Sequence, residues 1–125
     1  MNVVVDTSVW IDFFAGKASA ALESALQDGV VVLPPIVIAE LLSGVHKPRQ
    51  VQKLEAFLSE LPVHPTPREH WNAVGRMRRL LQQRGVSMST PDAHVAQSAL
   101  DLGALLLTRD RVFSTVQRMI GLRLG

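Results

Sequence analysis

Three short apolar runs, separated by segments with helical patterning, constrain the fold of this chain more than any other feature. They occupy residues 3–5, 30–33 and 104–107, and each ends on polar residues or on prolines. Continuous apolar runs of this length are typical of strands that are buried on both faces. Because strands that alternate with helices are joined by parallel βαβ crossovers, the pattern predicts an α/β domain whose parallel sheet is covered on both sides.

The segments between these runs are predicted to be helical. A helix is expected soon after the first polar turn, and residues 17–27 carry a helical stripe of apolar positions that includes Ala18. Pro34-Pro35 starts a helix that is expected to be largely buried, with Glu40 as its charged residue. Further helices are predicted over residues 50–61 and 68–84, from the N-cap candidate Thr90 to residue 102, and over 112–119. Short strands are predicted near residues 63–64 and 122–124.

Length and composition bound the remaining possibilities. The 125 residues, 47% of them hydrophobic, are enough for a single domain with one core, so we treat residues 1–125 as one domain. The absence of cysteine excludes disulfides, thiolate nucleophiles and zinc–thiolate sites, and it favours a cytoplasmic location. Residues 30–39 form the longest apolar stretch, which is too short for a membrane span, and no secretory leader is evident, so we expect a soluble protein.

The basic residues are mostly arginines, which suit the recognition of phosphate groups. Thirteen Lys and Arg against eleven Asp and Glu give a formal net charge of only +2. The arginines nevertheless gather in two stretches, Arg76, Arg78, Arg79 and Arg84, and then Arg109, Arg111, Arg118 and Arg123. A polyanionic partner is one interpretation of this clustering, and a solvated helix face is the other.

Four acidic residues occupy positions where a parallel α/β sheet gathers its ligands. Asp6 ends the first run and Asp110 follows the third, so the two carboxylates converge if those strands are neighbours. Asp92 lies in the first turn of a helix, where the helix dipole favours its ionised form. Each acid alone has a plain structural explanation, for example a turn, a helix start or, for Glu40, a salt bridge.

Taken together, the four acids favour a site for a divalent cation. Hydroxyl groups of Thr7, Ser8 and Thr108 accompany them in the sequence. Carboxylate oxygens are the ligands that Mg²⁺ and Mn²⁺ prefer. Such cations serve the hydrolysis of phosphodiesters, and one of the acids is available as a general base.

Four sequence blocks resemble the signature blocks of PIN-domain ribonucleases, in particular the VapC-type toxins of bacterial toxin–antitoxin pairs. The blocks are VVDTSVWID at residues 4–12, IAELLSG at 38–44, PDAHVA at 91–96 and LTRDRVF at 107–113. The resemblance implies a three-layer α/β/α domain with a central, mostly parallel sheet of about five strands. It also implies an Mg²⁺- or Mn²⁺-dependent endoribonuclease that acts on structured RNA such as tRNA or rRNA, a homodimer, and neutralisation by a cognate VapB-type antitoxin.

The resemblance also implies roles for individual residues. Asp6, Glu40, Asp92 and Asp110 match the acidic quartet of the family, in its metal-binding and catalytic roles, and Thr7, Ser8 and Thr108 match supporting hydroxyls. RNA contacts are assigned to Arg76, Arg78, Arg79, Arg109 and Arg111. Many relatives carry an aspartate before the phenylalanine of the last block, where this chain has Val112, so Asp110 acts without that neighbour.

Other polar and aromatic residues are left outside the predicted site. Asp12 is expected at the surface or facing an antitoxin. His94 lies two residues after Asp92, about 200° around a helix, and is not expected to share a ligand face with it. His46, His64 and His70 show no ligand spacing and are expected to be ordinary surface or partly buried histidines. The aromatic residues Trp10, Phe13 and Phe14 are expected in the core or in an interface.

Two alternatives to a nuclease remain open at this point. A strand that ends in aspartate also opens phosphatases with an aspartyl nucleophile, but these need a second aspartate two residues later, where this chain has Ser8. The other alternative is a catalytically inert module in which the acids form salt bridges and the arginines hold RNA or a protein. Loss of cation binding when Asp6 or Asp92 becomes asparagine would distinguish the metal site from that module.

Overall fold

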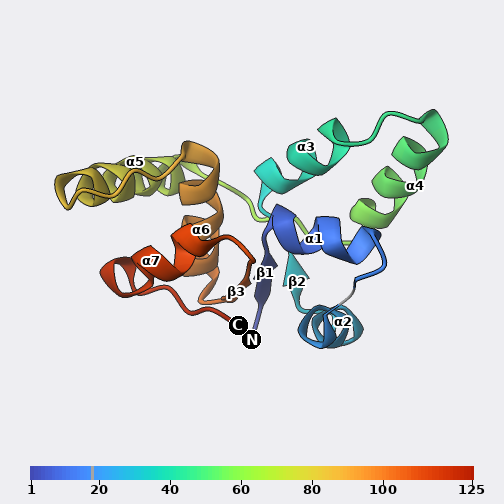
Figure 1. Cartoon of the computed structure of the whole chain (residues 1–125), viewed down its shortest axis with the longest axis horizontal. Coiled ribbons are helices and arrows are strands. Elements are labelled where there is room, and N and C mark those ends of the chain that lie inside the picture. The colour runs from blue at the N-terminus through green and yellow to red at the C-terminus, as the bar shows by residue number, and fades with distance from the viewer. Residues whose placement is uncertain (18) are drawn as a thin grey trace.

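A parallel sheet forms the centre of the domain. The computed structural model describes residues 1–17 and 19–125 (Figure 1). Strands β1 (Val3–Val5), β2 (Val31–Val32) and β3 (Leu105–Leu107) pair in the order β2-β1-β3, all parallel. The three apolar runs are therefore the three strands, as predicted, and the α/β class is confirmed.

The prediction of about five strands is wrong, because the two outer candidates form single bridges only. Val63 pairs with Leu33, and Leu124 pairs with Leu106, both in parallel. Residues 63–64 lie between Pro62 and Pro65, whose missing N–H groups prevent a longer ladder, so that His64 N and the Pro62 carbonyl make the two bonds to Leu33. The bridge at Leu124 consists of two bonds, from the Leu106 amide to the Arg123 carbonyl and from the Gly125 amide to the Leu106 carbonyl, both at 2.9 Å.

Seven helices are present in the described part of the chain. They are α1 (Thr7–Phe14), α2 (Ala20–Gln27), α3 (Pro35–Ser43), α4 (Pro48–Ser59), α5 (Arg68–Gln83), α6 (Thr90–Leu102) and α7 (Arg111–Ile120). The predicted polar turn after β1 is instead the start of α1. The predicted stripe at residues 17–27 becomes a helix only from Ala20, because Ser19 accepts a hydrogen bond from the Leu22 amide at 3.1 Å, and its position Ala18 lies outside the described residues.

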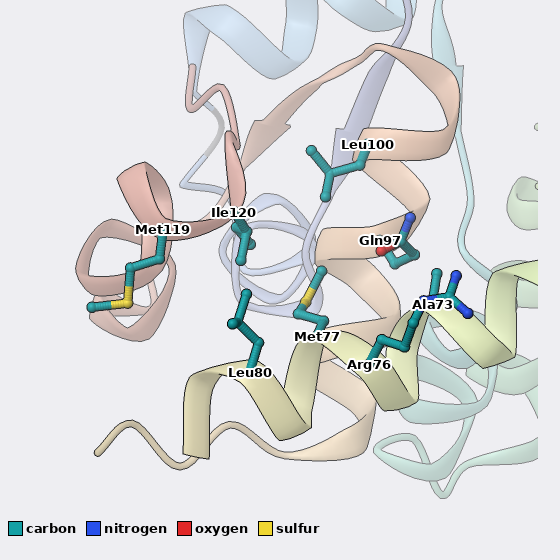
Figure 2. A pocket seen from close by; sticks show the side chains of 8 residues that line it. All are labelled: Ala73, Arg76, Met77, Leu80, Gln97, Leu100, Met119 and Ile120. Atoms are coloured by element: carbon teal, nitrogen blue, oxygen red, sulfur yellow. The ribbon is translucent and has the colours of Figure 1, made fainter. Parts of the chain in front are cut away.

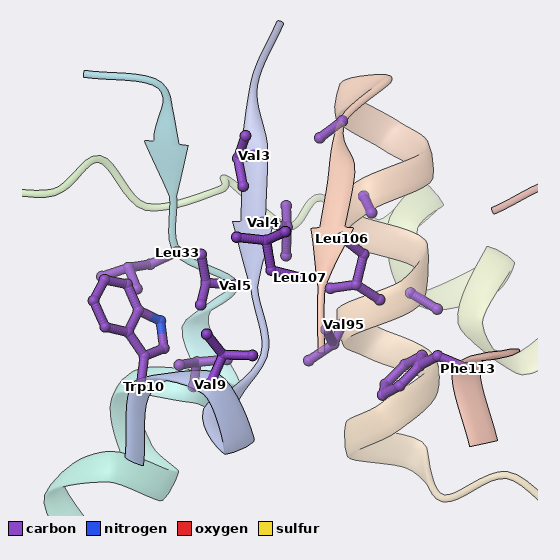
Figure 3. Packing of buried hydrophobic residues seen from close by; sticks show 14 of the residues in the cluster. Val3, Val4, Val5, Val9, Trp10, Leu33, Val95, Leu106, Leu107 and Phe113 are labelled. Atoms are coloured by element: carbon purple, nitrogen blue, oxygen red, sulfur yellow. The ribbon is translucent and has the colours of Figure 1, made fainter. Parts of the chain in front are cut away.

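The helices form a layer on each side of the sheet. Figure 1 shows α5, α6 and α7 on one side of the strands and α1 to α4 on the other, with α6 packed on β1 and β3. The core lies between the strands and the helices on either side of them. In Figure 3, Trp10 and Val9 of α1 lie on one side of the strands, and Val95 and Phe113 lie on the side of α6. None of the described helices combines the length and the apolarity that crossing a bilayer requires.

Helix α3 is less buried than predicted. Only Val37 and Leu41 are buried, and Glu40 is exposed. The helix packs on α1, α4 and α6 at the rim of the domain, so one side of it remains open to solvent. The expectation of a largely buried helix around Glu40 is therefore wrong.

Candidate active site

Four acidic side chains gather at the carboxyl ends of the central strands. Asp6 directly follows β1 and Asp110 lies three residues after β3. These two strands are neighbours, with Val5 opposite Leu107, so the predicted convergence is confirmed. The amide of Asp6 also donates to the Leu107 carbonyl at 2.9 Å, which holds Asp6 against the end of β3. Glu40 of α3 and Asp92 of α6 complete the quartet.

Asp6 is the buried member of the quartet, with 6% of its surface exposed. Its Oδ2 accepts hydrogen bonds from Ser8 Oγ at 3.0 Å and from Thr108 Oγ1 at 2.8 Å. A buried carboxylate is costly unless donors satisfy it, and these two hydroxyls supply them. They also fix the direction of the carboxylate, because one donor comes from α1 and the other from the segment after β3.

Glu40 and Asp110 are exposed, and the carboxylate of each accepts one hydrogen bond. Thr7 Oγ1 donates to Glu40 Oε1 at 2.7 Å, which ties α3 to the first residue of α1. Asp110 caps α7, since its Oδ1 accepts from the Val112 amide at 3.1 Å, and its own amide donates to Thr108 Oγ1 at 3.0 Å. Val112 thus contributes a backbone donor to the site, while its side chain packs against the core.

Asp92 is electrostatically coupled to the other three acids. Burial raises the pKa of Asp92 above its ordinary value, and repulsion from Asp110, Asp6 and Glu40 raises it further, against a hydrogen bond with Ser89 that lowers it. Desolvation and like charges therefore outweigh the helix dipole, which the sequence alone had favoured. The predicted N-cap is also wrong: Ser89 Oγ, not Thr90, accepts from the Asp92 amide at 3.2 Å.

The chemistry of this donor set fits a hard divalent cation. Every candidate ligand is a carboxylate oxygen, and the repulsion that raises the pKa of Asp92 is relieved by a positive charge placed among the four acids. The acids of the quartet are widely spaced, since no three of their carboxylates have oxygens within 4.8 Å of one another. Within residues 1–17 and 19–125, only His64, His70 and Asp101 have ligand atoms that close together.

That histidine cluster was missed by sequence reasoning. His64, His70 and His94 are 6%, 2% and 1% exposed, so His64 and His70, expected to be ordinary surface or partly buried histidines, are instead buried. His70 contacts both His94 and Asp101 through its two ring nitrogens. No spacing signal could have revealed this, because the residues come from a connector and from two helices that meet only in the folded chain.

The predicted RNA-contacting arginines occupy different environments. Arg78 Nε donates to the Met88 carbonyl at 2.9 Å and so ties α5 to the loop before α6. Arg76 and Arg79 are exposed on α5, and Figure 2 shows Arg76 at a largely apolar hollow between α5, α6 and α7.

The other two arginines flank Asp110 in the sequence. Arg109 forms an ion pair with Asp12, and its amide donates to Ser8 Oγ at 3.1 Å. Arg111, the first residue of α7, is exposed. Asp12 thus lies beside the site, but its carboxylate pairs with Arg109 and does not join the quartet.

Together, the fold and the quartet define a parallel α/β domain with a carboxylate site suited to divalent cations. The sequence profile of the PIN domain matches residues 3–119. The chain therefore belongs to the PIN domain family.

Similar proteins agree with this assignment. Ribonuclease VapC2 of Rickettsia felis is 28% identical to the chain over 104 residues, which cover 79% of this chain and 78% of the relative. The structure of VapBC2 from Rickettsia felis bound to a promoter DNA fragment matches with a TM-score of 0.81 at 22% identity, covering 100% of this chain and 98% of that chain. DNA-bound VapBC from Salmonella typhimurium matches with a TM-score of 0.80 at 22% identity, covering 100% and 97%. The fold is thus shared along the whole chain.

Proposed function

We propose that this chain is a metal-dependent endoribonuclease and the toxin of a toxin–antitoxin pair. The observation that carries the proposal is the convergence of Asp6 and Asp110 at the ends of the neighbouring strands β1 and β3, where Thr108 bonds to both residues. The similarity to ribonuclease VapC2 supports RNA as the substrate. We further propose tRNA or rRNA as the target, in keeping with the family resemblance of the sequence blocks.

Asp6, Glu40, Asp92 and Asp110 would hold Mg²⁺ or Mn²⁺. When bound, the cation supplies the positive charge that the scissile phosphate and the departing oxygen require. Asp6 is the best-ordered ligand, because Ser8 and Thr108 fix its carboxylate from two sides. Glu40 is oriented by Thr7, so the supporting hydroxyls act by positioning the acids.

Asp92 is the best candidate for the general base. The pKa of Asp92 is raised, chiefly by burial, and a more basic carboxylate accepts a proton more readily. A carboxylate oxygen of Asp92 would take a proton from the attacking water as the oxygen of that water bonds to phosphorus. The bond between phosphorus and the leaving ribose oxygen would break in the same step, and that oxygen would take a proton from a solvent water molecule.

The RNA backbone would approach the quartet beside Arg109 and Arg111. Both arginines adjoin Asp110, and both are exposed. Arg76 and Arg79 are exposed on α5 and would extend the contact to more distant phosphates. Arg78 is assigned a structural role in place of the predicted RNA contact, since its guanidinium holds the Met88 carbonyl.

An antitoxin partner is proposed on the side of α1. Ile11 and Phe14 of this helix are 57% and 45% exposed, and Phe14 packs on an aromatic group formed with Trp10, Phe13 and Phe57. Exposed apolar side chains on a rigid aromatic base are typical of protein interfaces. Three structures with the same fold are described as toxin–antitoxin or VapBC complexes, which supports a VapB-type partner.

A homodimer is proposed as well. The exposed side chains of Trp71 and Leu80 lie on α5, and the hollow in Figure 2 continues this surface to Met119 and Ile120 of α7. Light scattering on the purified chain tests the proposal: a mass of twice 13.7 kDa is expected, and the mass of a single chain would contradict it.

The nuclease is tested by incubating the purified protein with total cellular RNA in Mg²⁺, in Mn²⁺ and in EDTA, and by sequencing the product ends. We expect discrete, metal-dependent fragments that are absent with Asp6→Asn. Asp28→Asn is the matched control, since Asp28 is an exposed acid at the end of α2, and it should cleave like the wild type. Intact RNA with a metal-binding, inhibitor-free protein would favour the inert binding module instead.

A further inference from the structure

Three buried histidines and one aspartate, none of them part of the acidic quartet, form a cluster connected by short polar contacts. His64 follows the bridge to β2, His70 lies in the first turn of α5, and His94 and Asp101 lie on α6. Asp101 Oδ2 lies 3.0 Å from His64 Nε2 and 2.5 Å from His70 Nδ1. The cluster thereby joins the connector, α5 and α6.

We propose that His64, His70 and Asp101 form a binding site for a divalent transition-metal ion, with Zn²⁺ as the best fit. One nitrogen from each imidazole and one carboxylate oxygen lie within 4.8 Å of one another. In a tetrahedral zinc site with bonds of about 2.0–2.1 Å, neighbouring ligand atoms are about 3.3 Å apart. Both imidazole–carboxylate distances reach that spacing by shifts of less than about 1 Å.

The donor types separate this site from the quartet. Two imidazoles and one carboxylate suit Zn²⁺ and other borderline metals, whereas four carboxylates suit Mg²⁺ or Mn²⁺. The two sites also lie apart: Asp92 and Asp101 are nine residues apart on α6, which corresponds to about 14 Å along the helix axis. Each site can therefore be emptied or mutated without touching the ligands of the other.

The surrounding residues orient the ligands as in established metal sites. His70 Nε2 lies 2.7 Å from His94 Nδ1, and Gln97 Nε2 donates to Asp101 Oδ1 at 2.8 Å. Partners of this kind select the tautomer of a ligating histidine and the direction of a ligating carboxylate. His94 is 1% exposed, and its Nδ1 is placed to accept the Nε2 proton of His70, which leaves Nδ1 of His70 free for a metal ion.

The charge of the cluster also suits a cation. Aspartate carboxyl groups are ionised at neutral pH, and that of Asp101 lies against two imidazole nitrogens. Asp101 is therefore an anionic ligand at neutral pH. Its side chain is 25% exposed, which leaves a path for the metal and a place for a water molecule as the fourth ligand.

Stability alone does not account for this arrangement. His64 Nδ1 and His94 Nε2 are buried and have no hydrogen-bond partner among the residues that the structure describes. Buried polar atoms without partners are costly, and apolar side chains of similar volume would avoid that cost. A metal ion bound to His64 Nε2, His70 Nδ1 and Asp101 would offset that cost by linking the connector, α5 and α6 through one centre.

The structure supplies an optical reporter for the site. Trp71 stacks on His94 with a ring separation of 4.7 Å and an angle of 5°, and it meets His70 edge-on at 5.0 Å. The only other tryptophan, Trp10, is fully buried in α1, where it packs on Phe13, Phe14 and Phe57. Quenching by a paramagnetic ion such as Cu²⁺ or Ni²⁺ should therefore come from Trp71 and disappear in Trp71→Phe.

The test is Zn²⁺ titration calorimetry and the Co²⁺ absorption spectrum of the tag-free protein, in excess Mg²⁺ to occupy the quartet. We expect one Zn²⁺ per chain, a tetrahedral Co²⁺ spectrum and an increase in melting temperature with Zn²⁺. The double variant Asp6→Asn/Asp92→Asn should keep all three. His70→Gln should weaken Zn²⁺ binding by about 100-fold or more, since even the loss of a supporting partner costs about 10–100-fold.

Two further variants serve as a matched control and as a second test of the ligand set. His46→Gln removes an exposed histidine outside the cluster and should bind like the wild type. His64→Gln changes the connector rather than a helix, so it tests the site even if His70→Gln fails to fold. No Zn²⁺ binding to the folded wild type would overturn the proposal. So would binding that survives His64→Gln but is lost in the Asp6→Asn/Asp92→Asn variant.

Discussion

Replacing Thr108 by valine removes the hydroxyl that links the two acids at the ends of β1 and β3. Thr108 Oγ1 donates to the buried Asp6 carboxylate at 2.8 Å and accepts from the Asp110 amide at 3.0 Å. Valine has nearly the same shape, so the change removes hydrogen bonds rather than volume. A hydrogen bond to a charged group contributes about 1.5–3 kcal/mol, and we expect the free energy of unfolding to fall by that amount.

The corresponding shift in melting temperature follows from the size of the chain. At about 2.1 cal/mol/K per residue, unfolding of a chain this long has an entropy of about 0.26 kcal/mol/K, so Thr108→Val should lower the melting temperature by roughly 6–11 °C. Calorimetry in EDTA measures this without any contribution from a bound cation. RNA cleavage in Mg²⁺ should fall in parallel, because Asp6 loses one of the two donors that orient it.

Two controls separate this hydrogen bond from a general effect of the substitution. Thr108→Ser keeps the hydroxyl and should retain most of the stability. Thr115→Val makes the same change on the exposed face of α7, where Thr115 donates only to the Arg111 carbonyl, and should alter stability by less than about 0.5 kcal/mol. The reasoning is refuted if Thr108→Val melts within about 2 °C of the wild type, a shift that the 1.5–3 kcal/mol range does not allow.

Three further predictions concern α6 and the arginines. Ser89→Ala should cost about 0.5–2 kcal/mol in urea unfolding while Thr90→Ala costs much less, because Ser89 is the residue that caps α6; equal losses would contradict this. In the metal-free protein, the pKa of the Asp92 carboxyl is higher in the folded state than in the unfolded state, so the folded state binds the proton more tightly. The free energy of unfolding therefore falls as the pH rises from the unfolded pKa through the folded pKa. Asp92→Asn should therefore stabilise the metal-free protein at pH 7 but not at pH 3, as measured by chemical denaturation at both values. Arg79→Ala should weaken RNA binding and reduce its salt slope by about one, whereas Arg78→Ala should lower the melting temperature; the reverse result would restore the RNA role of Arg78.

Part of the candidate site was predictable because it depends on strand order and local chemistry. The placement of Asp6 and Asp110 after two apolar runs predicts that they meet, provided that the runs are adjacent parallel strands, and β1 and β3 are adjacent. The hydroxyls of Thr7, Ser8 and Thr108 were likewise assigned beside the acids, and each contacts one of them.

Other features of the same site could not be derived from neighbouring residues. The sequence around Glu40 is apolar and predicts burial, but only the packing of α3 on α1, α4 and α6 decides which side of the helix is open. Burial is the main reason that the pKa of Asp92 is raised, and repulsion from three carboxylates of distant segments raises it further, opposite to the direction that the helix dipole predicts. Arg78 and Arg79 are adjacent in the sequence, but only Arg78 reaches a buried carbonyl.

The sequence by itself determined the three strands of the sheet, the approximate limits of the helices after α1 and the acids at the edge of the sheet, although it overestimated the number of strands. Apolar runs, helical periodicity and prolines act over a few residues, so they can be recognised without the fold. The tertiary structure alone decided the histidine cluster, because His64, His70 and Asp101 meet only when α5 packs on α6. Burial, charge coupling and metal-ligand geometry arise from contacts between distant segments, and those contacts exist only in the folded chain.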